Sequence, residues 1–126
     1  MSRSVVHTDN APAAIGPYSQ AIRASGEFLF LSGQIPLKPD GDIVRGDIKD
    51  QVTQVMTNLE AVLAAAGLTF ANVTKTTILL SSMDHFPAVN EVYGGYFPSD
   101  PPARATYAVA GLPRGVDVEI EAIAVF

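Results

Sequence analysis

The sequence predicts an α+β fold in which two helices pack on one face of a mixed β-sheet. Segments rich in β-branched and aromatic residues are interspersed with segments of helical period. The glycine fingerprint GxGxxG, which follows the first strand of dinucleotide-binding α/β folds, is absent. No linker divides the 126 residues, so we expect a single domain over residues 1–126.

The N-terminal part of the chain predicts three strands. Residues 3–7 predict a short edge strand, and residues 18–24 and 27–32 predict a hairpin that turns at Ser25-Gly26. Within the last of these strands, residues 28–31 are apolar on both faces, which is typical of a strand in the sheet interior.

Two helices follow, separated by a strand over residues 73–80. Asp47 is a suitable N-cap for the first helix, and Gly67 is a suitable left-handed terminator. Its apolar residues recur at steps of three and four: Ile48, Val52, Val55, Met56, Leu59, Val62, Leu63 and Ala66. The second helix is predicted to begin near Ser82 or Asp84, with a proline tolerated in its first turn.

Residues 101–110 and 116–126 predict a closing β-hairpin in which both strands carry charge among apolar neighbours. Arg104 lies on the first strand, and Glu119 and Glu121 lie on the second. Such charges cost several kcal/mol in lost solvation unless they are paired or used. Two interpretations remain open at this point: a structural ion pair between Arg104 and one of the glutamates, or a functional site.

Composition excludes several classes of site. The chain has no cysteine, which removes disulfides, thiolate nucleophiles and cysteine-ligated zinc. The motifs GxxxxGK[ST], GxSxG and HExxH are absent, and His7 and His85 lack metal-ligand spacing. We therefore expect no metal site. The net charge of −5 argues against a broad nucleic-acid-binding surface.

The N-terminus lacks the apolar core of a signal peptide, and no apolar run is long enough to span a bilayer. We expect a soluble, cytoplasmic protein that does not bind membranes.

Six polar residues form the candidate site: Tyr18, Ser32, Asn90, Arg104, Thr106 and Glu119. Each also has a purely structural interpretation. Tyr18 could cap the core with its ring, Ser32 could end a strand, and Asn90 could face solvent on the second helix.

Several motifs, taken together and in order, resemble the RidA family, also called the YjgF family. The resemblance runs from about residue 8 to the last residue. The motifs are Asn10-Ala11-Pro12, Ile15-Gly16-Pro17-Tyr18-Ser19-Gln20, Ser32-Gly33-Gln34-Ile35-Pro36, Val73-Thr74-Lys75-Thr76-Thr77, Val89-Asn90-Glu91-Val92-Tyr93, Pro102-Ala103-Arg104 and Glu119-Ile120-Glu121-Ala122-Ile123-Ala124.

The resemblance implies a chorismate-mutase-like fold and a homotrimer with sites in clefts between subunits. It also implies hydrolytic deamination of reactive 2-imino and enamino acids, such as 2-aminoacrylate, 2-iminopropanoate and 2-iminobutanoate, to 2-oxo acids and ammonia. An iminium carbon is already electrophilic, so this chemistry needs no cofactor. A trimer would also cover the sheet face that two helices on the other face leave bare.

The resemblance assigns roles residue by residue. Arg104 would hold the substrate carboxylate, for which a planar guanidinium suits a bidentate contact. Glu119 would position or deprotonate the attacking water. Tyr18, Ser32 and Asn90 match polar positions that line the pocket. Thr106 stands where many relatives have cysteine, so the residue here can serve as a hydrogen-bond donor but not as a thiol.

Two other functions stay open. The same cleft could bind 2-oxo or other small carboxylic acids without turnover, as a binding or chaperone-like module, because both functions need Arg104. An endoribonuclease or translation inhibitor, also attributed to the family, is disfavoured by the acidic composition and the scarcity of Lys/Arg clusters.

Overall fold

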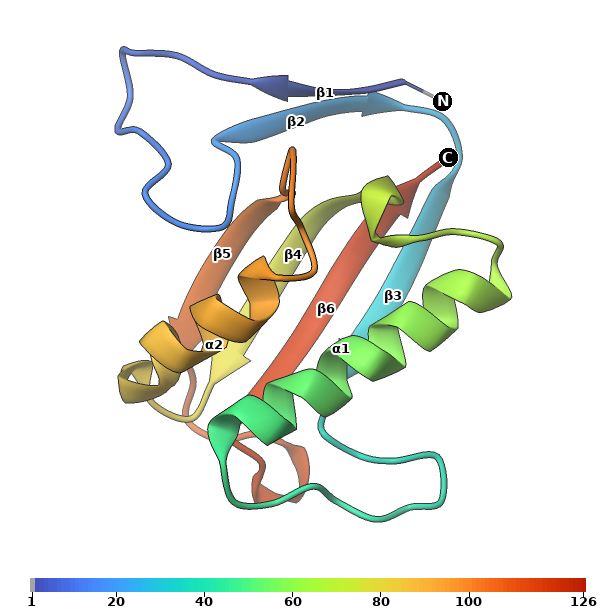
Figure 1. The fold of residues 1–126 in the computed structure, drawn as a ribbon, viewed down its shortest axis with the longest axis vertical. Coiled ribbons are helices and arrows are strands. Elements are labelled where there is room, and N and C mark those ends of the chain that lie inside the picture. Colours follow the sequence, from blue (N-terminus) through green and yellow to red (C-terminus); the bar gives the residue numbers. More distant parts are fainter. Residues whose placement is uncertain (1) are drawn as a thin grey trace.

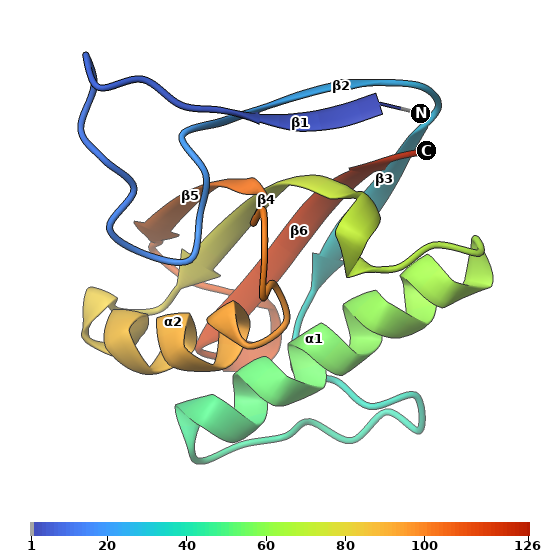
Figure 2. The same ribbon diagram turned by 45° about the horizontal axis from the view of Figure 1, so that its top comes forward.

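The computed structural model describes residues 2–126 and contains strands and helices in mixed order (Figure 1). In chain order they are β1 (Ser2–Val6), β2 (Ala21–Ser25), β3 (Phe28–Gln34), α1 (Ile48–Ala65), β4 (Val73–Leu80), α2 (Phe86–Gly94), β5 (Ala103–Ala108) and β6 (Val118–Val125). Strands β1 and β2 pair antiparallel as a separate ribbon, and the other strands form a sheet of order β3-β6-β4-β5. Figure 2 shows the ribbon crossing one end of this sheet.

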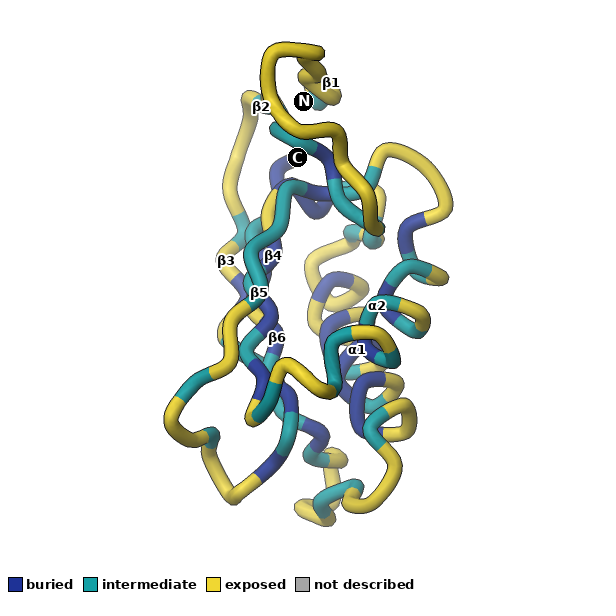
Figure 3. Tube along the Cα trace, turned by 90° about the vertical axis from the view of Figure 1, so that its left-hand side faces the viewer, coloured by how far each residue is buried: buried dark blue, intermediate teal, exposed yellow. Residues whose placement is uncertain are grey.

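Both helices lie on one face of the four-stranded sheet, and the other face is bare (Figure 3). Strand β6 pairs antiparallel with β3 and β4, whereas β5 runs parallel to β4. The sheet is therefore mixed, and the predicted α+β class is confirmed. No helix among residues 2–126 has the length and apolar character required to cross a lipid bilayer.

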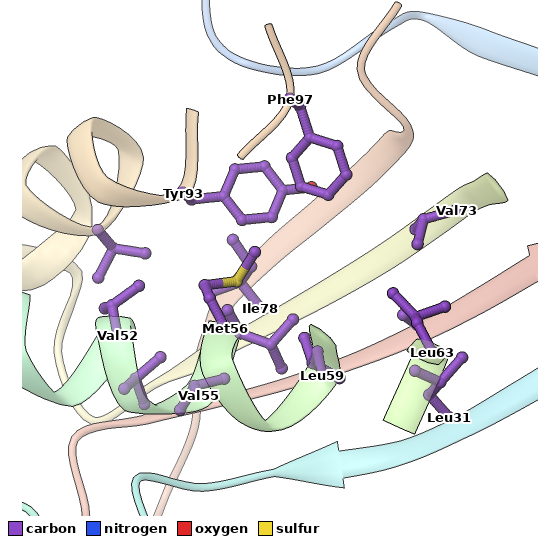
Figure 4. Close-up of a cluster of buried hydrophobic side chains, with 14 of the residues drawn as sticks. Leu31, Val52, Val55, Met56, Leu59, Leu63, Val73, Ile78, Tyr93 and Phe97 are labelled. Atoms are coloured by element: carbon purple, nitrogen blue, oxygen red, sulfur yellow. The ribbon is translucent and has the colours of Figure 1, made fainter. Parts of the chain in front are cut away.

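The core lies between the helices and the sheet (Figure 4). Helix α1 contributes Val52, Val55, Met56, Leu59 and Leu63, all at most 1% exposed. They pack on alternate residues of β4 and β6, because successive strand side chains point to opposite faces. The residues of the other parity, among them Glu119 and Glu121, consequently point away from the helices.

The helix signals in the sequence are confirmed. The Asp47 side chain accepts a hydrogen bond from the backbone N–H of Lys49, and Gly67 has φ +74° just beyond the end of α1. The second helical segment opens with a 3₁₀ turn over Met83–His85, capped by Ser82, and continues as α2 with a proline in its first turn.

The predicted closing hairpin is wrong. Strand β5 does not pair with β6, which lies between β3 and β4, and β5 occupies the opposite edge of the sheet. Burial explains the order, because β6 buries Val118, Ile120, Ala122 and Ala124 and so takes a central position. The segment from β4 through α2 to β5 instead forms a crossover connection, which places α2 over the parallel β4–β5 pair.

The predicted hairpin between residues 18–24 and 27–32 is also wrong. At Gly26, where φ is +141°, the chain leaves the ribbon, and Glu27 exchanges backbone hydrogen bonds of 2.8 and 3.0 Å with Phe126. This pairing makes β3 an edge strand rather than an interior one. Phe28 and Phe30 on its outer face are 58% and 71% exposed.

Candidate active site

Arg104 lies on β5 and points toward α2. The parallel register places it opposite Thr76 of β4, on the helix-covered face. Its Nη1 donates a 2.7 Å hydrogen bond to Oδ1 of Asn90 on α2. The crossover from β4 through α2 to β5 thus brings Asn90 and Arg104 together although they are 14 residues apart in the chain.

Aromatic rings surround the Arg104 guanidinium. Its Cζ lies 5.4 Å from the ring centre of Tyr18, 5.5 Å from that of Phe86 and 5.3 Å from that of Tyr93. The Tyr93 hydroxyl lies 2.7 Å from the Thr76 hydroxyl, and burial raises the pKa of Tyr93 to about 12, so this ring stays neutral. The rings fix the position of the cation.

Burial lowers the pKa of Arg104, and the nearby tyrosines oppose that shift. The guanidinium nevertheless stays charged at neutral pH. Within residues 2–126, no carboxylate oxygen lies within 4.0 Å of it. A half-buried cation without an anionic partner is suited to receive an anion from outside.

Thr106 lies two residues further along β5, so it shares the face of Arg104. Its hydroxyl is buried and has no hydrogen-bond partner among the described residues. A buried hydroxyl without a partner is costly, and a bound molecule would remove that cost. The helix-covered side therefore offers a cation and an unsatisfied hydroxyl.

Glu119 lies on the opposite face of the sheet. Its neighbours on β6, Val118 and Ile120, are fully buried under the helices, so Glu119 points toward the bare face. Its carboxylate lies against Gly33 of β3, where an added Cβ would overlap Oε2 and stand 2.8 Å from Cδ. Gly33 follows the exposed Ser32 within an irregularity of β3 between Leu31 and Gln34.

The structure thus assembles only part of the predicted site in one chain. Tyr18, Asn90 and Arg104 are brought together, and Thr106 shares their side of the sheet. Ser32 and Glu119 are not brought to them. The interpretation of Asn90 as a solvent-facing residue is wrong, because its side chain accepts the hydrogen bond from Arg104.

The proposed ion pair between Arg104 and either Glu119 or Glu121 is also wrong. The parity of β5 and β6 points the arginine toward the helices and both glutamates away from them. Adjacency in the chain suggested that the strand with Arg104 pairs with the strand that carries the glutamates. These strands, β5 and β6, are not neighbours in the sheet.

Two of the three aromatic rings around Arg104, those of Phe86 and Tyr93, were not predicted from the sequence. Phe86 and Tyr93 are not among the six candidate residues that the sequence indicates. They lie four residues before and three residues after Asn90, on one face of α2. That spacing around an amide was the signal that could have placed them beside Arg104.

The bare face of the sheet carries exposed apolar side chains beside charge. Phe30 and Tyr107 are 71% and 57% exposed. A hollow of about 220 Å³ on this face is lined by Phe30, Lys75, Thr77, Glu121 and Ile123, with Leu31 and Ala122 beneath. An exposed apolar surface of this kind is typical of a protein–protein contact.

The fold and the site define a small α+β protein in which an arginine without a carboxylate partner among residues 2–126 lies on an edge strand of the sheet. Residues 8–126 match the family model described as Endoribonuclease L-PSP. The chain belongs to this family, which is the RidA family that its motifs resemble.

Named relatives cover almost the whole chain. It is 56% identical to protein DfrA of Myxococcus xanthus, over 99% of this chain and 97% of that protein. It is 52% identical to the 2-iminobutanoate/2-iminopropanoate deaminase of Mus musculus, over 98% and 91%. Among solved structures, E. coli TdcF with bound serine is 39% identical, with a TM-score of 0.76 and 98% of both chains covered.

Proposed function

We propose that this protein hydrolyses 2-imino acids, such as 2-iminopropanoate and 2-iminobutanoate, to 2-oxo acids and ammonia. The observation that carries the proposal is Arg104, a half-buried guanidinium with no carboxylate partner among residues 2–126. Relatives named for this reaction, at about 50% sequence identity, support it, as does the structural relative E. coli TdcF with its bound serine.

The substrate carboxylate would bind to the Arg104 guanidinium, with which no carboxylate among residues 2–126 pairs. Nη1 of Arg104 is engaged by Asn90, which leaves the other guanidinium N–H groups for the ligand. The unpartnered Thr106 hydroxyl is a further donor on the same face. Such contacts fix the orientation of the imino carbon that follows the carboxylate.

Glu119 would then have to come from another copy of the chain. In one chain it lies on the bare face of β6, whereas Arg104 lies on the edge strand β5 under α2. A homotrimer whose subunits pack through their bare faces would bury Phe30 and bring a neighbour's Glu119 and Ser32 toward the β5 edge. The proposal therefore includes an active site completed between subunits.

The reaction needs one water molecule and balanced proton transfers. The water oxygen bonds to the iminium carbon while Glu119 accepts a proton from the water. Glu119 returns that proton to the nitrogen of the tetrahedral adduct. The C–N bond then breaks and ammonia leaves. Glu119, again a carboxylate, accepts the proton of the remaining hydroxyl as the carbonyl of the 2-oxo acid forms, and passes it to the departing ammonia to give ammonium.

The test generates the imine in place with a threonine dehydratase and traps unreacted imine with semicarbazide. The wild-type protein should divert the imine to 2-oxobutanoate, and Arg104→Ala should lower kcat/KM by about 10²- to 10³-fold. Wild-type protein that leaves semicarbazone formation unchanged would refute the proposed reaction.

Binding without turnover is the second candidate, because Arg104 and the amide and rings that hold it all belong to a single chain. A binder would take up 2-oxobutanoate with an affinity that depends on Arg104 but leave the imine unaltered. Calorimetry with 2-oxobutanoate, run beside the trapping assay, separates the two functions.

A further inference from the structure

The segment from His7 to Tyr18 leads to Arg104 with almost no burial to hold it. Residues 7–16 are all exposed, and Ile15 is 92% exposed. Yet the segment ends with the Tyr18 ring 5.4 Å from the Arg104 guanidinium carbon. Within one chain, apolar packing does little to fix so exposed a segment, and its conformation there depends on hydrogen bonds.

Gln20 supplies most of those hydrogen bonds. Its Nε2 donates to the backbone carbonyls of Pro12 at 2.7 Å, Thr8 at 3.1 Å and, more weakly, Ala11 at 3.5 Å. Its Oε1 accepts a 2.8 Å bond from the backbone N–H of Thr8. A single side chain thus gathers both ends of residues 8–12, which have no regular secondary structure of their own.

Neighbouring residues attach the gathered segment to the site. Ser19 is buried, its N–H donates to the Pro102 carbonyl at 3.1 Å, and its hydroxyl donates to the Pro101 carbonyl. Both acceptors immediately precede β5, which carries Arg104. Pro17 lies against Gly94 at the end of α2, where an added Cβ would stand 3.2 Å from Pro17 Cβ.

We infer that Gln20 is a positioning residue: its bonds to residues 8–12 hold the segment that leads to Tyr18, so that this ring stays on the Arg104 guanidinium and the carboxylate site is formed before the ligand arrives. Arg104 itself is held by Asn90 and by rings from α2. Loss of Gln20 should therefore loosen the Tyr18 wall and leave the rest of the site intact.

This inference rests on the proposed function for its kinetic consequence. The carboxylate is present in substrate, transition state and product alike, so a looser Tyr18 wall weakens all three equally. Such uniform weakening raises KM and leaves kcat nearly unchanged. A residue that merely supports the fold would instead lower the melting temperature and the amount of active protein.

The test compares Gln20→Glu and Gln20→Leu with the wild type. The glutamate keeps the shape and the acceptor for Thr8 but loses the donor and faces carbonyl oxygens; the leucine removes both functions without adding charge. Gln54→Glu is the matched control, because Gln54 lies on α1 and donates only to Asn58. We expect KM to rise about five- to tenfold in both Gln20 variants, the effect of one or two lost hydrogen bonds, and to stay unchanged in the control.

Hydrogen exchange supplies a readout that does not depend on turnover. Peptides covering residues 7–20 should exchange faster in both Gln20 variants, while those covering α1 and β6 should not change. Unchanged exchange in residues 7–20 would overturn the inference, as would faster exchange with KM unaltered.

Failure of the proposed function can be distinguished from failure of this inference. If the wild-type protein does not hydrolyse imines, the same variants are compared by their affinity for 2-oxobutanoate in calorimetry. Affinity that falls with faster exchange then supports the role of Gln20, and unchanged affinity refutes it.

Discussion

The two faces of the sheet hold their charged residues in different ways. On the helix-covered face, Arg104 is held by an amide and three rings from its own chain. On the bare face, the Glu119 carboxylate lies against Gly33, and no cation among residues 2–126 pairs with it. Under the proposed function, the chain alone would hold the carboxylate-binding residue in place, whereas the residue that handles the water would depend on assembly.

Disrupting the proposed trimer should have the largest effect on imine hydrolysis. Phe30→Asp places a charge on the bare face, where the wild-type side chain is 71% exposed, so the subunit should still fold. Light scattering should show a monomer, and imine hydrolysis should fall to background. A variant that stays a fully active monomer would contradict the shared site.

Removing the proposed base should have the next largest effect. Glu119→Gln keeps the size of the side chain and loses its ability to accept a proton, so kcat should fall by about 10²- to 10⁴-fold. Affinity for 2-oxobutanoate should stay near the wild-type value, because the Arg104 half is unaltered. Glu121→Gln, two residues along the same face, is the matched control and should retain hydrolysis.

Weakening the carboxylate contact should have a smaller effect. Arg104→Lys keeps the charge but loses the bidentate geometry and the hydrogen bond to Asn90, so kcat/KM should fall by about 10- to 100-fold. Most of this loss should appear as a higher KM in steady-state kinetics. A loss confined to kcat would argue against carboxylate binding by Arg104.

Gly33→Ala should displace Glu119 without removing it. The new methyl group would overlap the Glu119 carboxylate, which must rotate away from Gly33. We expect kcat to fall by about three- to tenfold, with the assembly retained in light scattering. Unchanged kcat would show that Glu119 works in a different position from the one it takes in the single chain.

The smallest expected effect is on the free energy of unfolding, and it concerns Asp117, which belongs to neither half of the proposed site. Asp117 lies just before β6, where hydrogen bonds from Gln51 and then Ser81 lower the pKa of its carboxyl group below the ordinary value. A lowered folded-state pKa stabilises the protein above the unfolded-state pKa, and this stabilisation is lost as pH falls through the folded-state value.

Asp117→Asn should therefore destabilise the protein near neutral pH, and the difference from wild type should shrink below about pH 4. The side chain is 37% exposed, so the effect should be less than about 1 kcal/mol in denaturant unfolding. A difference that grew toward low pH would contradict the assignment.

Local signals in the sequence predicted local structure well. The Asp47 cap, the Gly67 terminator and the strand over residues 73–80 all appear where their residues indicated. Strand pairing was not predictable in this way, because adjacency in the chain suggested two hairpins that do not form. The choice of central strand depends on total burial, which only the packed fold determines.

For the candidate site, too, single residues with a local signal could be predicted, whereas their arrangement in space could not. Arg104 was found because a cation among small apolar residues is conspicuous in a strand, and Asn90 because its motif resembled a family. Thr76 and Tyr93 were missed because buried neighbours of a site look like core residues. No pattern could place Glu119 across the sheet from Arg104, since that depends on which strands pair.

Arg104, which has no carboxylate partner among residues 2–126, has a consequence for inhibition by the reaction product. The carboxylate that Arg104 would hold in the imine is still present in the 2-oxo acid that leaves. Product and substrate should consequently compete for one cation, so the protein would work fastest where 2-oxo acids are consumed as quickly as they form. Accumulating product would slow its own formation without any second binding site.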